Sequence, residues 1–251
     1  MSPLRIVIVD DEEPARNRLR ELLEDCRAEL PHSVAGEAEN GVEGLRIVAE
    51  GRAEVVLVDI QMPEMSGIEF ARHLLVMETP PAVIFVTAHD RYAVEAFEVN
   101  AVDYLTKPVR AARLLAALKK AANGARLARG VLERIDPGPR RYLSVAERGR
   151  VTLVPVSEVV YLRAELKYVT VRTGNREHLV EESLAQLEQE FGGVFVRIHR
   201  NCLVARRLIR GFERATETEG EIGWSVILEG CDEKLPVSRR LWAQVKSLVA
   251  S

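Results

Sequence analysis

Four short segments in the first half of the chain end in polar side chains. They are residues 6–9 before Asp10 and Asp11, residues 55–58 before Asp59, residues 82–86 before Thr87, and residues 103–106 before Lys107. The first three are continuous apolar runs, which are typical of strands buried on both faces of a parallel sheet. In such sheets, ligands bind at the carboxyl ends of the strands. We therefore expect three carboxylates, a hydroxyl and an ammonium group to meet at one edge of a sheet.

Helical segments separate these strands. The first begins at Glu12-Glu13-Pro14, because acidic side chains suit the positive end of a helix and proline is tolerated in its first turn. Apolar residues then recur at helical spacing, at Leu19, Leu22, Leu23 and Cys26. A short strand at 33–38 and a last helix at about 111–122 complete five strand–helix pairs. The sequence therefore predicts an α/β fold with a doubly wound, five-stranded parallel sheet.

The alternation of strands and helices stops after residue 122. Residues 123–140 contain Asn123-Gly124 and Asp136-Pro137-Gly138-Pro139, which are strong turn and linker signals. Short alternating runs then dominate, at 142–145, 151–154, 159–163, 168–172 and 226–228, with a hairpin turn at 173–176. Two helices are expected there, at about 182–190 and from Arg239 onward. We predict an α/β domain at 1–122, a partly helical linker at 123–140 and a mostly-β domain at 141–251.

Charge is distributed unevenly along the 251-residue chain. Residues 1–122 contain 14 Lys or Arg and 21 Asp or Glu, a balance of −7, whereas residues 123–251 contain 21 and 17, a balance of +4. An acidic first half and a basic second half suit different partners, such as a metal ion and a polyanion. Ordinary scatter of surface charge explains the same split equally well.

Nothing in the sequence directs the chain to a membrane or to an oxidising compartment. Its three widely spaced cysteines, Cys26, Cys202 and Cys231, form no metal-ligand pattern and no disulfide framework. The uncharged stretch at 79–89 is too short to span a bilayer, and the N-terminus lacks the pattern of a signal peptide. We expect a cytoplasmic protein with no membrane partner.

The polar strand ends suit a divalent metal and a phosphoryl group. A carboxylate attacks phosphorus only when charge repulsion is relieved, and Mg²⁺ held by oxygen ligands relieves it. The predicted metal ligands are Asp10, Asp11, Asp59 and the backbone carbonyl of Gln61. Asp59 would accept the phosphoryl group, Lys107 would neutralise its oxygens and Thr87 would donate a hydrogen bond to them. Taken singly, an aspartate at a strand end is often a helix cap, but the joint placement favours a site.

Residues 4–120 resemble the receiver domain of two-component response regulators. The matching motifs, in the expected order, are Asp10-Asp11, Asp59 with Met62-Pro63 and Gly67, Thr87-Ala88, and Lys107-Pro108. The resemblance implies a flavodoxin-like fold, a sensor histidine kinase that donates phosphate to Asp59, and slow self-catalysed hydrolysis. Tyr104 falls where the family has a rotating aromatic switch, although an ordinary strand aromatic explains it equally well. Phosphorylation would reshape the face around residues 92–99 and favour homodimers.

Basic residues gather in connections of the second half. They are Arg197, His199 and Arg200, then Arg206, Arg207 and Arg210, then Arg239 and Arg240. The closing helix resembles a docking helix more than a groove-reading helix, because Trp242, Val245, Leu248 and Val249 recur at core spacing. Basic loops on a β scaffold can enter DNA grooves. From the residues alone, solvated surface charge is the simpler interpretation.

Three stretches, 160–169, 195–204 and 235–241, resemble the signature segments of the LytTR DNA-binding domain, which would cover about 140–248. Segments 93–97 and 101–105 also resemble receivers joined to that domain, as in AlgR/LytR-type regulators. The family binds double-stranded DNA at direct repeats, through loops in successive major grooves. The implied contacts are Lys167, Arg200, Asn201 and Arg239, with Arg240 a weaker candidate. His199 is expected to stabilise its own loop, and Ala205 stands where other members carry asparagine.

The combined prediction is a phosphorylation-controlled transcription regulator that catalyses only its own phosphorylation and dephosphorylation. One alternative is an adaptor whose second domain binds protein or RNA, which the modest charge of +4 permits. Another is a phosphatase with an aspartyl nucleophile. Asp59-Ile60-Gln61 lacks the second carboxylate, two residues on, that such phosphatases use as an acid.

Overall fold

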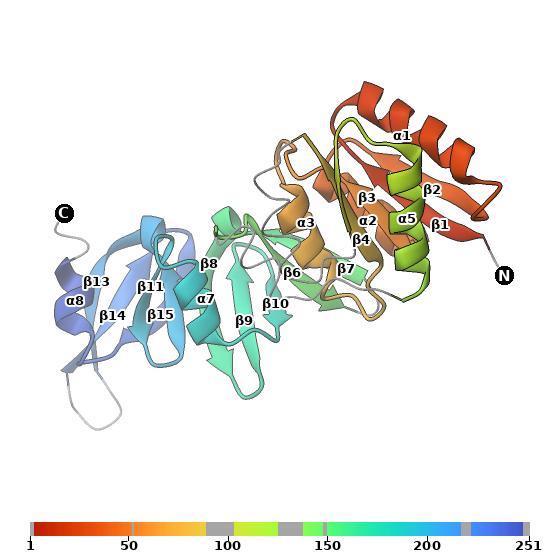
Figure 1. Cartoon of the computed structure of the whole chain (residues 1–251). Helices are drawn as coiled ribbons and strands as arrows, with labels where there is room; N and C mark the ends of the chain where they lie inside the picture. The colour runs from red at the N-terminus through yellow and green to blue at the C-terminus, as the bar shows by residue number, and fades with distance from the viewer. Residues whose placement is uncertain are drawn as a thin grey trace. The chain divides into compact units, whose positions relative to one another are not determined.

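Figure 1 shows the computed structural model of the chain, which describes residues 3–51, 53–88, 103–124, 138–147, 150–216 and 222–247. The chain divides into two compact units, with the main division between Pro137 and Gly138. The first unit is α/β and the second is mostly β, so both predicted fold classes are confirmed. Most of the expected linker lies outside the described residues, and its boundaries stay a prediction.

The first unit contains a parallel sheet of five strands in the order β2-β1-β3-β4-β5. The strands are β1 (Leu4–Val9), β2 (His32–Ala38), β3 (Val55–Val58), β4 (Ala82–Thr87) and β5 (Asp103–Thr106). The described helices are α1 (Glu13–Cys26), α2 (Gly41–Gly51), α3 (Gly67–Leu74) and α5 (Ala111–Ala122). The strand order reverses between β1 and β3, and ligands of doubly wound sheets bind at such a reversal. Residues 92–99, the predicted site of the phosphorylation-dependent surface, lie outside the described residues.

Alternate strand residues face opposite sides of this sheet. The side that carries Ile8 and Leu57 packs against α1 and α5 in one buried core. The other side carries Val9 and packs closely against α2 and α3, since a methyl group added to Gly44 would lie 3.0 Å from both Val9 and Phe70. With both sides covered, β3 and β4 are buried throughout. Polar side chains near β3 and β4 are therefore confined to the ends of these two strands.

The described residues from 138 onward form three sheets. Their strand orders are β10-β9-β8-β12-β11, β13-β14-β15 and β6-β7. The strands are β6 (Tyr142–Glu147), β7 (Arg150–Pro155), β8 (Val159–Glu165), β9 (Tyr168–Thr173), β10 (Glu177–Val180), β11 (Phe195–His199), β12 (Cys202–Ala205), β13 (Ile209–Thr216), β14 (Ile222–Leu228) and β15 (Cys231–Val237). The helices are α7 (Leu184–Glu190) and α8 (Trp242–Ser247), with 3-10 segments η1 (Val156–Glu158) and η2 (Arg206–Leu208).

Polar contacts join the two larger sheets of this unit. Tyr161 of β8 donates its hydroxyl hydrogen to Glu233 of β15 at 2.5 Å, and Arg163 of β8 contacts the same carboxylate. Arg163 also lies over the Tyr161 ring, 4.8 Å from its centre. Beneath these residues an apolar core combines Val204 of β12 with Val226 of β14. The position of β15 relative to β8 is therefore set by both apolar and charged contacts.

The second unit has strands that alternation alone did not predict, namely β10, β11, β12, β13 and β15. β15 is mostly exposed, carries three charged residues and contains Pro236, which a strand at a sheet edge tolerates. β12 is buried throughout, so it lacks alternation altogether. Helix α8 begins at Trp242 rather than at Arg239, and Leu248 and Val249 lie outside the described residues. Among the described helices, none has the length and apolarity needed to cross a bilayer.

Candidate functional sites

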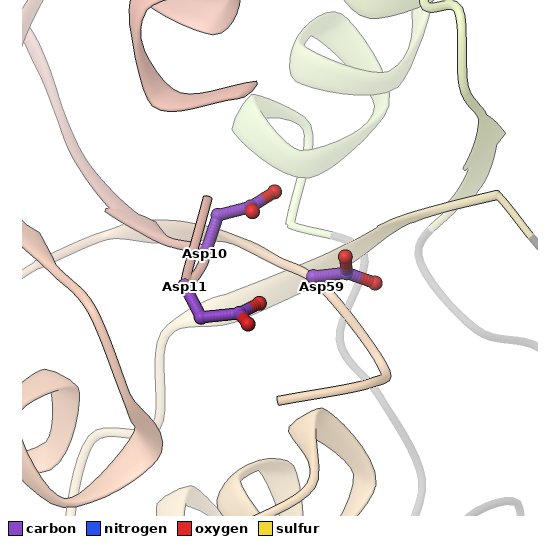
Figure 2. Close-up of side chains that lie close together, drawn as sticks. All are labelled: Asp10, Asp11 and Asp59. Carbon is purple, nitrogen blue, oxygen red and sulfur yellow. The ribbon is translucent and has the colours of Figure 1, made fainter. Parts of the chain in front are cut away.

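Three carboxylates lie together at the carboxyl edge of the first unit's sheet. Figure 2 shows Asp10 and Asp11 next to each other beyond β1, with Asp59 across from them beyond β3. One oxygen atom from each carboxylate lies within 4.8 Å of the other two. Asp10 and Asp59 are buried, whereas Asp11 is exposed. The structure thus brings the three predicted carboxylate ligands together, because parallel strands all end at the same edge.

Lys107, which follows β5, contacts two of these carboxylates. Its Nζ donates to Asp59 Oδ2 at 2.7 Å and forms an ion pair with Asp10 Oδ2 at 2.8 Å. Burial lowers the pKa of the Lys107 ammonium, but the two carboxylates outweigh burial and raise the pKa above its ordinary value. Burial also raises the pKa of Asp10, and Lys107 only partly opposes that effect. An ammonium group whose charged form is favoured therefore lies against Asp59.

The remaining predicted residues of the first unit lie on neighbouring strand ends. Thr87 is fully buried at the end of β4, and its backbone carbonyl accepts a hydrogen bond from the backbone N–H of Lys107 at 2.8 Å. Tyr104 is buried within β5. The backbone N–H of Gln61 donates to Asp59 Oδ1 at 3.3 Å, so the Gln61 segment lies beside the acidic cluster. The roles of Thr87, Tyr104 and Gln61 stay predictions.

The acidic cluster has the composition of a site for a hard divalent cation. Three carboxylates face one ammonium group there, so negative charge is in excess. Carboxylate oxygens are the ligands that Mg²⁺ prefers, and the ion usually keeps several water molecules. The exposed Asp11 leaves one side of the cluster open to solvent. The residues present therefore fit the magnesium ion that the sequence predicts.

Arg16 of α1 is a residue that sequence reasoning missed. Its guanidinium is buried and donates from Nη1 to the backbone carbonyl of Asp10 at 2.8 Å. Glu37 and Glu39 lie 3.8 Å and 3.2 Å from its other nitrogen atoms. Arg16 thus holds the backbone that carries Asp10. Arg16 lies three residues before Leu19, on the apolar side of α1, and this spacing could have indicated a buried arginine.

Gly67 allows the loop after Asp59 to pass close to the strand end. A methyl group at Gly67 would lie 2.0 Å from the Asp59 carbonyl oxygen and 3.1 Å from Ile60 Cα. The backbone N–H of Gly67 also donates to the Ile60 carbonyl at 2.9 Å. The obstructing atoms belong to the backbone, which cannot rotate away as a flexible side chain can. Any larger residue must therefore displace the segment that carries Asp59.

A Gly67→Ala protein is expected to have a free energy of unfolding lower by about 1–3 kcal/mol, because overpacking at this position shifts the backbone. Urea titration followed by circular dichroism measures the change. Gly51→Ala is the matched control, because nothing lies within 4 Å of an added methyl group there. Equal stability of the two variants would contradict the close approach of Gly67 to Asp59.

The residues predicted to contact DNA lie in three connections of the second unit. They are Lys167 between β8 and β9, Arg200 and Asn201 between β11 and β12, and Arg239 and Arg240 between β15 and α8. The four cationic side chains are exposed, and Asn201 is half-buried. The structure therefore leaves all four charges accessible to a polyanion.

Backbone hydrogen bonds bring these three connections together. The N–H of Ala164, near the end of β8, donates to the Asn201 carbonyl at 2.8 Å. The N–H of Ser238 donates to the Ile198 carbonyl at 2.8 Å, which attaches the segment before Arg239 to β11. Segments that are far apart in the sequence thus form one continuous border of the unit. Sequence reasoning had placed basic residues in connections but had not shown that the connections are neighbours.

The β11–β12 turn is held by its own side chains. His199 Nδ1 contacts Asn201 Oδ1, which places His199 in the loop-stabilising position expected of it. Arg197 donates to the Arg200 carbonyl at 2.8 Å and pairs with Glu188 of α7 at 2.6 Å. Arg197 therefore supports the turn rather than presenting its own charge, a distinction that the basic pattern alone did not make.

Comparison with known families assigns both units. The model of the response regulator receiver domain matches residues 6–119, and that of the LytTr DNA-binding domain matches residues 149–250. The chain is also 42% identical to the positive alginate biosynthesis regulatory protein of Pseudomonas aeruginosa, over 98% of this chain and 99% of that protein. The chain belongs to the LytTR class of response regulators.

Another relative of this response regulator agrees with it in length. The sensory transduction protein LytT of Bacillus subtilis is 30% identical over 98% of this chain and 99% of that protein. Among solved structures, the response regulatory domain of protein mrkE from Klebsiella pneumoniae is 28% identical, with 48% and 96% of the two chains covered and a TM-score of 0.43. A LytTr DNA-binding domain from Bacillus cereus is 21% identical, with 45% and 99% covered and a TM-score of 0.38.

The full-length relatives and the two domain matches confirm that this response regulator is a two-component transcription regulator. Its partners are a sensor histidine kinase and DNA. The adaptor alternative is not favoured, because the second unit matches a DNA-binding domain.

Proposed function

We propose that this regulator is switched by phosphorylation of Asp59 and then binds promoter DNA through the three connections of its second unit. The observation that carries the first part is the position of Lys107. Its Nζ lies 2.7 Å from Asp59 and 2.8 Å from Asp10, beside the cluster of three aspartates. A nucleophilic carboxylate needs a fixed cation on one side and a metal on the other, and this edge supplies residues for both.

Within the proposed site, a carboxylate oxygen of Asp59 attacks the phosphorus atom of a phosphohistidine on the kinase. The P–O bond to Asp59 forms as the P–N bond breaks, and the histidine leaves. Asp10, Asp11, Asp59 and the Gln61 carbonyl would hold Mg²⁺, which would neutralise charge between the carboxylates and the phosphoryl oxygens. Lys107 donates hydrogen bonds to the same oxygens. The regulator therefore catalyses only its own phosphorylation and the later hydrolysis of its own phosphoryl group.

The proposed switch uses Thr87 and Tyr104. A phosphoryl group on Asp59 brings negative charge and strong acceptor oxygens. The Thr87 hydroxyl donates to one of these oxygens, and the Tyr104 ring moves into the space that Thr87 leaves. The surface formed by β5, α5 and residues 92–99 then favours a homodimer. Residues 92–99 lie outside the described part of the chain, so support for this step comes from the buried positions of Thr87 and Tyr104.

The proposed DNA interface consists of Lys167, Arg200, Asn201, Arg239 and Arg240. Arginine reads guanine edges in the major groove through paired hydrogen bonds, whereas other cations neutralise phosphates. The hydrogen-bonded border described above supports joint binding of these residues to one site. A dimer would occupy two direct repeats. We also propose that the receiver ends at residue 122, that a linker occupies 123–140, and that the regulator acts in the cytoplasm.

Phosphorylation is expected to require Mg²⁺, because the three aspartates repel an anionic donor without it. Incubation with acetyl phosphate and Mg²⁺ should add one phosphoryl group per chain, measured by intact-protein mass spectrometry. Excess EDTA should remove the mass increase, and an excess of Mg²⁺ over EDTA should restore it. Equal incorporation in EDTA and in Mg²⁺ would contradict a metal-dependent site.

The DNA interface is tested by selection from random duplex DNA, with and without acetyl phosphate and Mg²⁺. Enrichment of a direct-repeat sequence, with affinity that falls steeply as salt rises, is the expected result, because bound cations release counterions from DNA. Recovery of no preferred duplex under either condition would count against the proposed interface.

A further inference from the structure

The β8–β9 turn carries a leucine in an unfavourable place. β8 and β9 pair up to Glu165 and Tyr168, so the loop consists of Leu166 and Lys167 alone. The Leu166 side chain is fully exposed, and its backbone φ is +52°. Two-residue hairpin loops with a positive φ at the first position normally have glycine there. Both the exposure and the backbone conformation of Leu166 therefore oppose folded stability.

Such a residue is explained by function rather than by folding. Among the described non-glycine residues, only Glu64 and Leu166 have a positive φ. Glu64 lies in a loop, and its charged side chain suits an exposed position there. A strained and solvent-exposed apolar side chain at the tip of a rigid hairpin instead indicates a contact that is absent from the isolated chain.

The surroundings of Leu166 select the partner. Lys167 is exposed beside it, and its Nζ lies 5.7 Å from the centre of the Tyr168 ring. The acidic neighbour Glu165 pairs with Arg163 at 3.7 Å, which reduces its repulsion of an anion. The hydrogen bond from Ala164 attaches this turn to the Arg200–Asn201 turn. An apolar tip next to a cation and a basic turn suits the major groove, where thymine methyl groups lie between phosphate backbones.

We propose that Leu166 contacts the C5-methyl group of a thymine and so determines the base preferred at one position of the DNA site. This inference rests on the proposed DNA interface and adds a residue to it. A protein partner is less suitable, because a stable protein interface buries about 800 Å² on each side. One leucine at a hairpin tip contributes only a small part of such an area, but it is large enough to contact one methyl group.

The experiment removes the methyl group and the leucine separately. The full-length regulator is first used to select a site from random duplex DNA, and each thymine of that site is then replaced singly by uracil, which lacks the C5-methyl group. Affinities are measured for the wild type, Leu166→Gly, Leu166→Met and Leu179→Ala. Leu179 is a matched control, because it is a half-exposed leucine of the same unit that lies on β10.

Replacement of one particular thymine by uracil should lower the affinity of the wild type about fourfold, the loss expected for one buried methyl group. Leu166→Gly should lose this sensitivity, Leu166→Met should retain it, and Leu179→Ala should match the wild type. Glycine suits the positive φ, so a weakened Leu166→Gly protein is not explained by unfolding.

Two results would overturn the proposal. One is a Leu166→Gly protein that keeps the full sensitivity to uracil at every thymine. The other is a Leu166 variant with altered self-association and the wild-type sensitivity to uracil. That result would show that Leu166 contacts a second copy of the chain. Failure of the wild type to bind any duplex would instead refute the DNA interface, which separates the two hypotheses.

Discussion

An Asp59→Asn protein is expected to incorporate no phosphoryl group from acetyl phosphate and Mg²⁺, whereas the wild type incorporates one. Asparagine has the size of aspartate but lacks the anionic oxygen that attacks phosphorus. The fold should persist, because Lys107 keeps its ion pair with Asp10 at 2.8 Å. Intact-protein mass spectrometry measures incorporation, and circular dichroism verifies the fold.

Asp103→Asn is the matched control for this experiment. Asp103 also belongs to the parallel sheet, but its carboxylate pairs with Arg113 at 3.0 Å and takes no part in the acidic cluster. This variant should be phosphorylated as the wild type is. Retained incorporation in Asp59→Asn, at another mapped residue and at the wild-type rate, would show that Asp59 is not the acceptor.

The Arg200→Ala and Arg239→Ala proteins are each expected to bind the selected DNA site roughly 10- to 100-fold more weakly, the usual loss when a base-contacting arginine is removed. Binding to unrelated DNA should change much less, so selectivity should fall with affinity. Both arginines are exposed on connections that backbone hydrogen bonds join into one border. Fluorescence anisotropy with cognate and scrambled duplexes measures both quantities.

Arg210→Ala removes one positive charge from the same unit without touching that border. Arg210 is exposed on β13 and pairs with Glu229 of the adjoining segment. Its loss should weaken cognate and scrambled duplexes slightly and equally, through long-range charge alone. If all three substitutions weakened both duplexes to the same extent, the proposed base contacts of Arg200 and Arg239 would be wrong.

The site in the first unit could be predicted because its geometry follows from strand direction. In a parallel sheet, the residue after each strand lies at the same edge whatever the length of the intervening chain. Asp10 and Asp59 could therefore be grouped from their positions after apolar runs, and Lys107 from its position after the predicted strand at 103–106. Arg16 escaped notice, because its hydrogen bond to the Asp10 carbonyl depends on how α1 packs over β1.

The second unit was harder to predict. Its strands are short and antiparallel, and several of them, such as the buried β12 and the charged edge strand β15, show no clean alternation. Resemblance to a family, rather than periodicity, gave the predicted DNA contacts. The chain alone did not reveal that the β8–β9 turn adjoins the β11–β12 turn or that Arg197 supports the latter.

Local order along the chain thus determined the α/β class, the basic connections and the acidic strand ends, because burial patterns and strand direction are encoded within a few neighbouring residues. Tertiary packing alone decided which side chains became supports, as with Arg16 and Arg197, and which turn was strained, as at Leu166. These features arise from contacts between distant segments, and no local pattern of residues encodes such contacts.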